Sequence, residues 1–279
     1  MKRHQRILLV TGLTLCSLRA ILAQDGAPQP ASVSTQAPSE ERKNADKARQ
    51  LIQLAIDALG GPAYLGVRDM QQQGRTYTLH HGQSTSNGIL FWRFVVPPDK
   101  ERVELTKERD IAQLFAGDKG YEVTYKGVRS LEAKELSDYL RRRKFSLDIV
   151  LRQWVNAKGM AMFYEGMAMS GNRPADQVTL VSAQNESVTI LLDPSTHLPI
   201  GKKFSWRDPE DRQLNLEEET YDNYRPVGGI MTPYNVTRFF NGDMTNQRFL
   251  NSASYNENLT PAMFDPNSGY NPMKQPGKK

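Results

Sequence analysis

The sequence predicts an α+β protein built on one strongly curved antiparallel sheet, an incomplete β-barrel, with helices covering its concave side. The predicted elements run in the order helix, strands, helices, strands, so that few helices must cover many strands. Roughly ten or more strands are expected, and a sheet of that size normally curls or closes. One strand, within residues 88–98, is apolar on both faces, although antiparallel strands usually keep one face polar.

Residues 1–23 have the pattern of a secretory signal peptide, with a basic start, an uncharged apolar run and a cleavage site expected after Ala23. The apolar run is short for a bilayer span, and a retained membrane anchor is the alternative. The only cysteine, Cys16, lies in this segment, so the mature chain is expected to use no disulfide. We therefore expect a protein of the periplasm or, alternatively, a secreted one.

The net charge of +5 arises largely from the predicted signal peptide. The whole chain has 36 Lys and Arg residues against 31 Asp and Glu residues, and loss of Lys2, Arg3, Arg6 and Arg19 brings the two nearly into balance. A chain without a marked excess of positive charge lacks the electrostatic signature of nucleic-acid binding.

Residues 24–42 are rich in Pro, Ala, Ser and Gln and are interpreted as a disordered arm. A single folded domain is expected over residues 43–266. It begins with a helix that ends at Gly60-Gly61-Pro62. Apolar residues at helical spacing form one stripe along it: Ala48, Leu51, Ile52, Ala55, Ile56 and Leu59.

After this helix the apolar period changes from about 3.6 to 2, which predicts consecutive antiparallel strands. They are expected near residues 68–80, 88–96, 100–106, 111–116, 121–125 and 128–131, and, after a helical break, near residues 161–170, 176–183, 187–193, 198–207, 214–224, 230–240 and 244–255. The break, residues 131–155, is interpreted as two helices that meet near Lys144. A polar tail, residues 267–279, is expected to be disordered.

The doubly apolar strand needs a cover on both faces. Side chains alternate along a strand, so Leu90, Trp92, Phe94 and Val96 share one face, and Ile89, Phe91, Arg93 and Val95 share the other. The second helix of the break places Leu147, Val150, Leu151 and Trp154 on one side.

Enzyme signatures are absent: the chain has no Gly-x-Ser-x-Gly, no His-Glu-x-x-His, no phosphate loop and no dinucleotide fingerprint. We therefore predict no catalytic residues and no cofactor. His80 and His81, with His197 as a third ligand, could suggest a metal site, but strand neighbours point to opposite faces, and a hairpin tip is the preferred interpretation.

Two Met-x-Met units, Met160/Met162 and Met167/Met169, could bind monovalent copper. Methionines more often fill irregular apolar surface, and in a cavity they would suit ligands of variable shape. No metal site is predicted.

Two charged runs allow alternative interpretations. Arg141–Lys144 is either a solvated helix end, favoured by the helix dipole, or a site for anionic lipid headgroups or an acidic partner. Glu217–Glu219 is interpreted as a polar outer strand face with one inward carboxylate.

Several segments, in order along the chain, together resemble the lipoprotein-sorting carriers of the Lol system and the wider family of half-barrel lipid-binding proteins. They are the first helix with the strand that reaches Gly74, the aromatic strand that ends in a proline turn followed by Gly117–Tyr121, Asp193–Pro199, Tyr224–Pro233, and the closing Tyr255–Leu259 with Met263–Pro266. Where the carriers have an arginine before the proline that closes the aromatic strand, this chain has Val96, with Arg93 slightly earlier.

The resemblance implies a half-barrel with an apolar concave side, closed by helices and able to hold acyl chains. We expect a non-enzymatic periplasmic binding or carrier protein, monomeric, whose ligand is a lipid, a lipoprotein acyl chain or another apolar molecule, with an envelope protein as a possible partner. The residues expected to bind the ligand are Leu90, Trp92, Phe94, Val96, Leu147, Val150, Leu151 and Trp154. The alternative is a structural, interaction or sensor protein of the cell envelope with a solid core and no ligand.

Overall fold

The computed structural model describes residues 39–85 and 87–271. The helices are α1 (Glu40–Leu59), α2 (Pro62–Leu65), α3 (Ala133–Lys144) and α4 (Leu147–Arg152), with short 3-10 turns η1 (Trp154–Asn156) and η2 (Pro261–Phe264). The strands are β1 (Met70–His80), β2 (Gln83–Ser84), β3 (Ile89–Val96), β4 (Lys100–Leu105), β5 (Ile111–Ala116), β6 (Lys119–Thr124), β7 (Gly127–Ser130), β8 (Ala161–Ser170), β9 (Arg173–Val181), β10 (Ser187–Leu192), β11 (Pro199–Arg207), β12 (Leu214–Val227), β13 (Ile230–Phe240) and β14 (Asp243–Tyr255).

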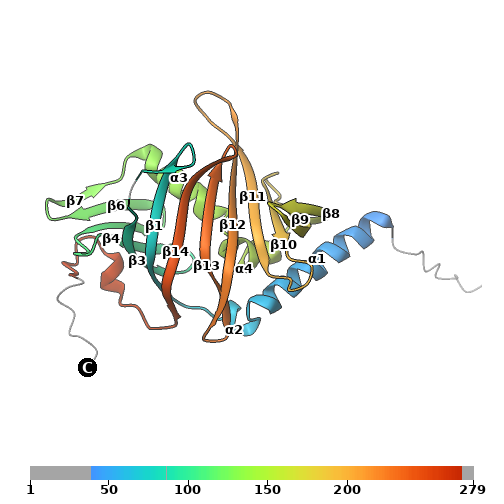
Figure 1. Cartoon of the computed structure of the whole chain (residues 1–279), viewed down its shortest axis with the longest axis horizontal. Coiled ribbons are helices and arrows are strands. Elements are labelled where there is room, and N and C mark those ends of the chain that lie inside the picture. Colours follow the sequence, from blue (N-terminus) through green and yellow to red (C-terminus); the bar gives the residue numbers. More distant parts are fainter. Residues whose placement is uncertain (1–38, 86, 272–279) are drawn as a thin grey trace, which may run out of the picture. The chain divides into compact units, whose positions relative to one another are not determined.

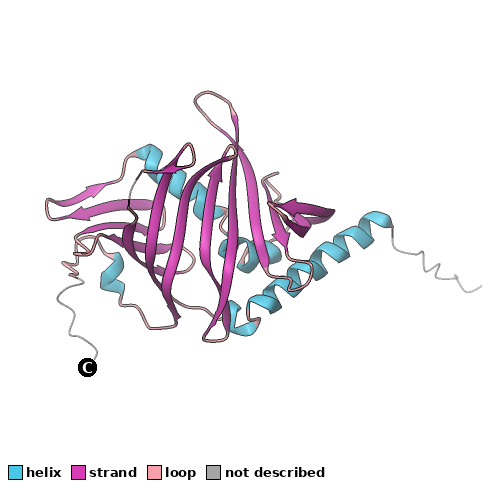
Figure 2. Ribbon diagram, in the orientation of Figure 1, coloured by secondary structure: helices cyan, strands magenta, loops and turns pink. Residues whose placement is uncertain are grey.

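The strands form a single antiparallel sheet, as predicted (Figure 1). Its order is β7-β6-β5-β4-β3-β1-β14-β13-β12-β11-β10-β9-β8, with β2 paired to β1. Each run of strands is a meander, and β1 pairs with β14 to join the two runs. Strands β7 and β8 are the two free edges, so the curved sheet does not close into a barrel. Figure 2 shows α3 and α4 behind the strands in this view.

The predicted boundaries of two terminal segments need correction. The signal peptide, residues 1–23, and most of the arm lie outside the described residues, but α1 already begins at Glu40. The Ser39 side chain caps this helix by accepting a hydrogen bond from the backbone N of Arg42, 3.3 Å away. At the C-terminal end, the centre of the Tyr270 ring lies 4.6 Å from the Arg102 guanidinium. The packed part of the chain therefore extends beyond residue 267, where the disordered tail was predicted to begin.

The apolar stripe predicted for α1 is buried as expected. The helix packs against β8 and β9, and the Asn44 side chain both donates to the backbone O and accepts from the backbone N of Tyr164, at 2.8 and 2.9 Å. These bonds satisfy part of the free edge of β8. The helix ends at Gly60, with φ 125°, where a Cβ atom would clash with the backbone O of Gly229.

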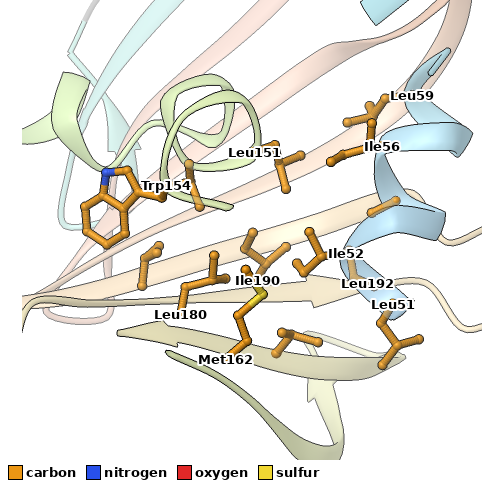
Figure 3. Packing of buried hydrophobic residues seen from close by; sticks show 14 of the residues in the cluster. Leu51, Ile52, Ile56, Leu59, Leu151, Trp154, Met162, Leu180, Ile190 and Leu192 are labelled. Carbon is orange, nitrogen blue, oxygen red and sulfur yellow. The ribbon is translucent and has the colours of Figure 1, made fainter. Parts of the chain in front are cut away.

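Half of the concave face is filled by the protein's own side chains. Figure 3 shows Leu51, Ile52 and Ile56 of α1 in one apolar cluster with Leu151 of α4 and with Ile190 and Leu192 of β10. On the same cluster, the ring of Phe145 stacks on Phe204 at a centroid distance of 4.3 Å. This end of the half-barrel is therefore a solid hydrophobic core.

The convex face of β3 is also covered, by residues 256–270, which we call the C-terminal strap. Asp69 anchors the strap, because its buried carboxylate accepts hydrogen bonds from the backbone N of Glu257, Asn258 and Leu259 at 2.7–3.3 Å. Farther along the strap, Met263 and Phe264 pack on Phe94, with Trp92 and Val96 beside them.

A buried ion cluster completes this convex side. The Arg102 Nε donates to Glu104 at 2.5 Å, Arg109 pairs with the other oxygen of Glu104, and Arg102 Nη1 donates to the backbone O of Met263 at 3.1 Å. The convex face of β3 is therefore covered by the C-terminal strap and this ion cluster.

Within the described part of the chain, no helix is both long and apolar enough to cross a lipid bilayer.

Candidate ligand-binding cavity

The other half of the concave face is hollow. A cavity of about 450 Å³ lies between the sheet and the lid, a name we give to α3 and α4 together. Its volume is within the range of about 300–1,000 Å³ found for small-molecule sites. The apolar part of its wall includes Phe91, Val95, Val103, Leu105, Phe115 and Leu250 from the sheet and Leu147 and Ile149 from the lid.

The structure reverses the predicted face of β3. Phe91, Arg93 and Val95 line the cavity, whereas Trp92, Phe94 and Val96 lie under the C-terminal strap, and Leu90 shares their side of the strand. The pattern could not distinguish the faces because both are apolar, and the strap that covers one of them lies far away in sequence.

The lid residues divide between cavity and core. Leu147 lines the cavity, but Val150, Leu151 and Trp154 point into the solid core beside α1. Among the residues predicted to bind a ligand, Leu147 is thus the one that reaches the cavity. Helix α4 separates the solid half of the half-barrel from the hollow half.

The first polar group in the cavity joins the sheet to the lid. The Arg93 guanidinium donates to both oxygens of Glu101, at 2.7 and 3.2 Å, and to Gln72 at 3.2 Å. From α3, the Tyr139 hydroxyl donates to Glu101 at 3.0 Å, and the Tyr139 ring stacks on Phe115. Burial opposes ionisation of Glu101, but Arg93 outweighs it and lowers the pKa of this carboxyl.

A second polar group lies across the cavity on β11, β12 and β13. Glu219 accepts hydrogen bonds from Arg238 and Tyr221, both at 2.8 Å, and pairs with the buried Lys202 at 3.4 Å. Burial opposes ionisation of Glu219, yet Lys202 and Arg238 together hold the pKa of this carboxyl well below its ordinary value.

Arg248 of β14 lines the cavity between these two groups. Its Nε atom is buried and has no hydrogen-bond partner among the described residues. Burial, together with the nearby Arg93 and Arg238, outweighs the opposing effect of Glu219 and Glu101 and lowers the pKa of the Arg248 guanidinium to about 9, so the side chain still carries its charge at neutral pH. Among the described residues, Glu101 and Glu219 are already paired with Arg93 and Arg238, and no carboxylate forms an ion pair with Arg248.

The basic run Arg141–Lys144 holds the lid in place, which corrects its interpretation as a solvated helix end. Arg141 lies 3.4 Å from the centre of the Trp206 ring and donates to Glu217 at 3.0 Å. Arg143 donates to the backbone O of Asp99 at 3.2 Å, and Lys144 pairs with Glu186 at 2.5 Å. Arg142 faces the cavity.

Glu217 pairs with the lid and Glu219 lines the cavity, so this acidic run has two inward carboxylates instead of the one expected. The methionines are dispersed: Met162 is in the core, whereas Met167 and Met169 are exposed. None of the four methionines lines the cavity, contrary to the role considered for them.

His80 and His81 lie at the β1–β2 hairpin, as predicted. Residues 39–85 and 87–271 contain no group of three or more His, Cys, Asp and Glu side chains placed to hold a metal ion.

Glu101 and Arg248 could not be placed in the cavity from the sequence, because both lie on strands with polar residues on each face; for Glu217–Glu219 one inward carboxylate was expected, but not which one. One signal was present: Arg93 interrupts an otherwise apolar strand, and a charged residue on a face that must be covered needs a buried partner. That partner is Glu101.

Two solved structures with a TM-score above 0.5 are similar to this chain in fold. A DUF1329 family protein from Desulfovibrio piger is 10% identical, with a TM-score of 0.53 over 78% of this chain and 97% of that chain. A protein domain from Vibrio parahaemolyticus, assigned to outer membrane lipoprotein sorting, is 12% identical, with a TM-score of 0.52 over 80% of this chain and 97% of that chain. A LolA superfamily protein from Nitrosomonas europaea is 13% identical, with a TM-score of 0.49 over 78% of this chain and 97% of that chain. No protein-family model matches the sequence, and a comparison with curated proteins gives no match.

Proposed function

We propose that this protein is a non-enzymatic carrier or binding protein that encloses the acyl chain of a lipid, of a lipoprotein or of another apolar ligand. The observation that carries the proposal is the cavity of about 450 Å³ between the sheet and the lid. An apolar chain gains about 0.8 kcal/mol for each methylene group removed from water, so this cavity can retain a chain without any catalytic group. The predicted signal peptide supports action in the periplasm or outside the cell.

The lid suits reversible loading. Several of the contacts that fasten α3 to the sheet and its turns are polar, such as Tyr139 with Glu101, Arg141 with Glu217 and Lys144 with Glu186. When the lid moves, polar contacts can be exchanged for hydrogen bonds to water, whereas the apolar core around α1 cannot open without a large loss of burial. We therefore assign ligand entry to movement of α3, with α1 and β8–β11 remaining fixed.

The test is displacement of an uncharged fluorescent probe, N-phenyl-1-naphthylamine, by long-chain ligands. Val103 of β4 lines the cavity, and Val103→Trp should fill part of it and abolish probe binding. Val128 of β7 is exposed, and Val128→Trp should leave binding unchanged. If the wild-type protein takes up neither probe nor any acyl ligand, or if Val103→Trp binds as the wild type does, the proposal is wrong.

A second function, docking of another envelope protein, has one observation in its favour. The edge strand β8 exposes Phe163, Met167 and Met169, and exposed edge strands with apolar side chains are common docking surfaces. In that case Val103→Trp should preserve the activity of the protein in cells, whereas Met167→Ser combined with Met169→Ser should remove it.

A further inference from the structure

We propose that the cavity binds an amphiphile with an acidic headgroup, a carboxylate or a phosphate on an acyl chain, and that Arg248 is the residue that holds this headgroup. This inference rests on the proposed function and names the chemical class of its ligand.

Arg248 forms no ion pair with any carboxylate of the described residues. Arg93 has Glu101, and Arg238 has Glu219, but the buried Nε atom of Arg248 has no acceptor among these residues. A buried charge without a partner is strongly unfavourable. A ligand carboxylate or phosphate would supply the acceptor oxygens, and a guanidinium group can donate two parallel hydrogen bonds to such a group.

The part of the cavity beside Arg248 is surrounded by an excess of positive charge. Glu219 is already shared between Lys202 and Arg238. Arg142, on the lid side of the cavity, has its pKa lowered by burial and then by Arg238. An anion between the sheet and the lid would therefore contact Arg248 on the sheet side and lie near Arg142 on the lid side. Its binding would favour the closed position of the lid.

An apolar part of the cavity wall begins next to Arg248. In the β13–β14 register, Val236 lies opposite Arg248, and Leu250 is the next residue of β14 on the same face. Leu250 packs against Phe91 of β3, with Val103 and Leu105 of β4 beside them. With its headgroup at Arg248, a ligand would thus place its acyl chain along this apolar wall, which forms a trough in the cavity.

The chemistry of the wall separates this ligand from other occupants. A metal ion would be repelled by the arginines, and a neutral lipid would leave Arg248 without a partner. A free phosphate or acetate ion could pair with Arg248 but would leave the trough unfilled. Headgroup and chain together satisfy both parts of the cavity.

The experiment compares three ligands of equal chain length, palmitate, hexadecyl phosphate and hexadecanol, in displacing N-phenyl-1-naphthylamine from the full-length chain. Hydrogen bonds to charged groups contribute about 1.5–3 kcal/mol, so both acidic ligands should bind the wild type at least about 10-fold more tightly than hexadecanol. Arg248→Met should bind all three alike, with hexadecanol binding undiminished. The control Arg68→Met, at an exposed arginine outside the cavity, should behave as the wild type does.

Stability provides a second readout. Because Arg248→Met removes an unpaired buried charge, the ligand-free variant should unfold at a temperature no lower than the wild type, whereas a purely structural arginine would lower it.

The following results would overturn the inference. Equal binding of palmitate and hexadecanol to the wild type, or a preference for palmitate that survives Arg248→Met, would show that Arg248 does not hold a headgroup, while leaving the proposed function intact. Displacement by inorganic phosphate as effective as that by hexadecyl phosphate would identify a free-anion site instead. Failure of every ligand to bind would overturn the proposed function and this inference with it.

Discussion

Phenylalanines on opposite faces of β3 provide a sharp comparison. Phe91 lines the cavity, whereas Phe94 packs beneath Met263 and Phe264 of the C-terminal strap. Both are almost fully buried, with 2% and 6% of their surface exposed, so both replacements by alanine will destabilise the protein. The two variants should differ in ligand binding.

The expected magnitudes follow from these environments. Replacing a buried Phe by Ala typically lowers the free energy of unfolding by about 3–5 kcal/mol. For a domain of this size each kcal/mol shifts the melting temperature by about 2–4 °C, so Phe94→Ala should melt roughly 6–20 °C lower. Its ligand affinity should be unchanged. Phe91→Ala should weaken binding by roughly 10-fold or more, because one apolar contact of about 1.5–3 kcal/mol is lost.

Both quantities can be measured on the same samples, by thermal unfolding and by probe displacement at a temperature where each variant is folded. A double-mutant cycle of Phe94→Ala with Met263→Ala should give a coupling of about 0.5–3 kcal/mol, because the side chains are in contact. The assignment of faces is refuted if Phe94→Ala loses ligand binding at an unchanged melting temperature, or if Phe91→Ala binds as the wild type does.

Three further predictions concern the polar groups. Glu219→Gln leaves Lys202 buried and unpaired and should lower the free energy of unfolding by about 3–5 kcal/mol near neutral pH. Because the folded-state pKa of Glu219 is depressed, urea unfolding should show that the stability difference between wild type and variant shrinks as the pH falls below the ordinary pKa of 4.5. Arg141→Ala removes the contact between α3 and Glu217, and amide hydrogen exchange should accelerate in α3 but not in α1. Asp69→Asn weakens the anchor of the C-terminal strap, and limited proteolysis should then cleave the strap faster, whereas the substitution Asp118→Asn at an exposed turn should have no effect.

The sequence predicts the strands well because their alternation is sharp. Each predicted strand corresponds to one in the structure within a few residues, and the two-residue β2 was the one missed. The two helices meeting near Lys144 and the buried stripe of α1 are also confirmed. These features depend on local periods, which a single chain carries in full.

The candidate site was predicted less well because its geometry depends on distant segments. Which face of β3 is concave is decided by the strap after β14 and by the pairing of β1 with β14, and no local period records either. Arg248 lies on a strand that mixes polar and apolar residues on both faces, so alternation could not place it inside. The choice between a cavity and a solid core was also too simple, since α4 divides the concave face into one half of each kind.

The most direct test of the central claim is a crystal structure of the protein bound to a fatty acid that carries bromine along its chain. We expect anomalous peaks inside the half-barrel, between β3–β4 and the lid, with the carboxylate near Arg248. Peaks confined to the outer surface, such as beside β8, with the space beneath α3 filled by protein side chains, would contradict it.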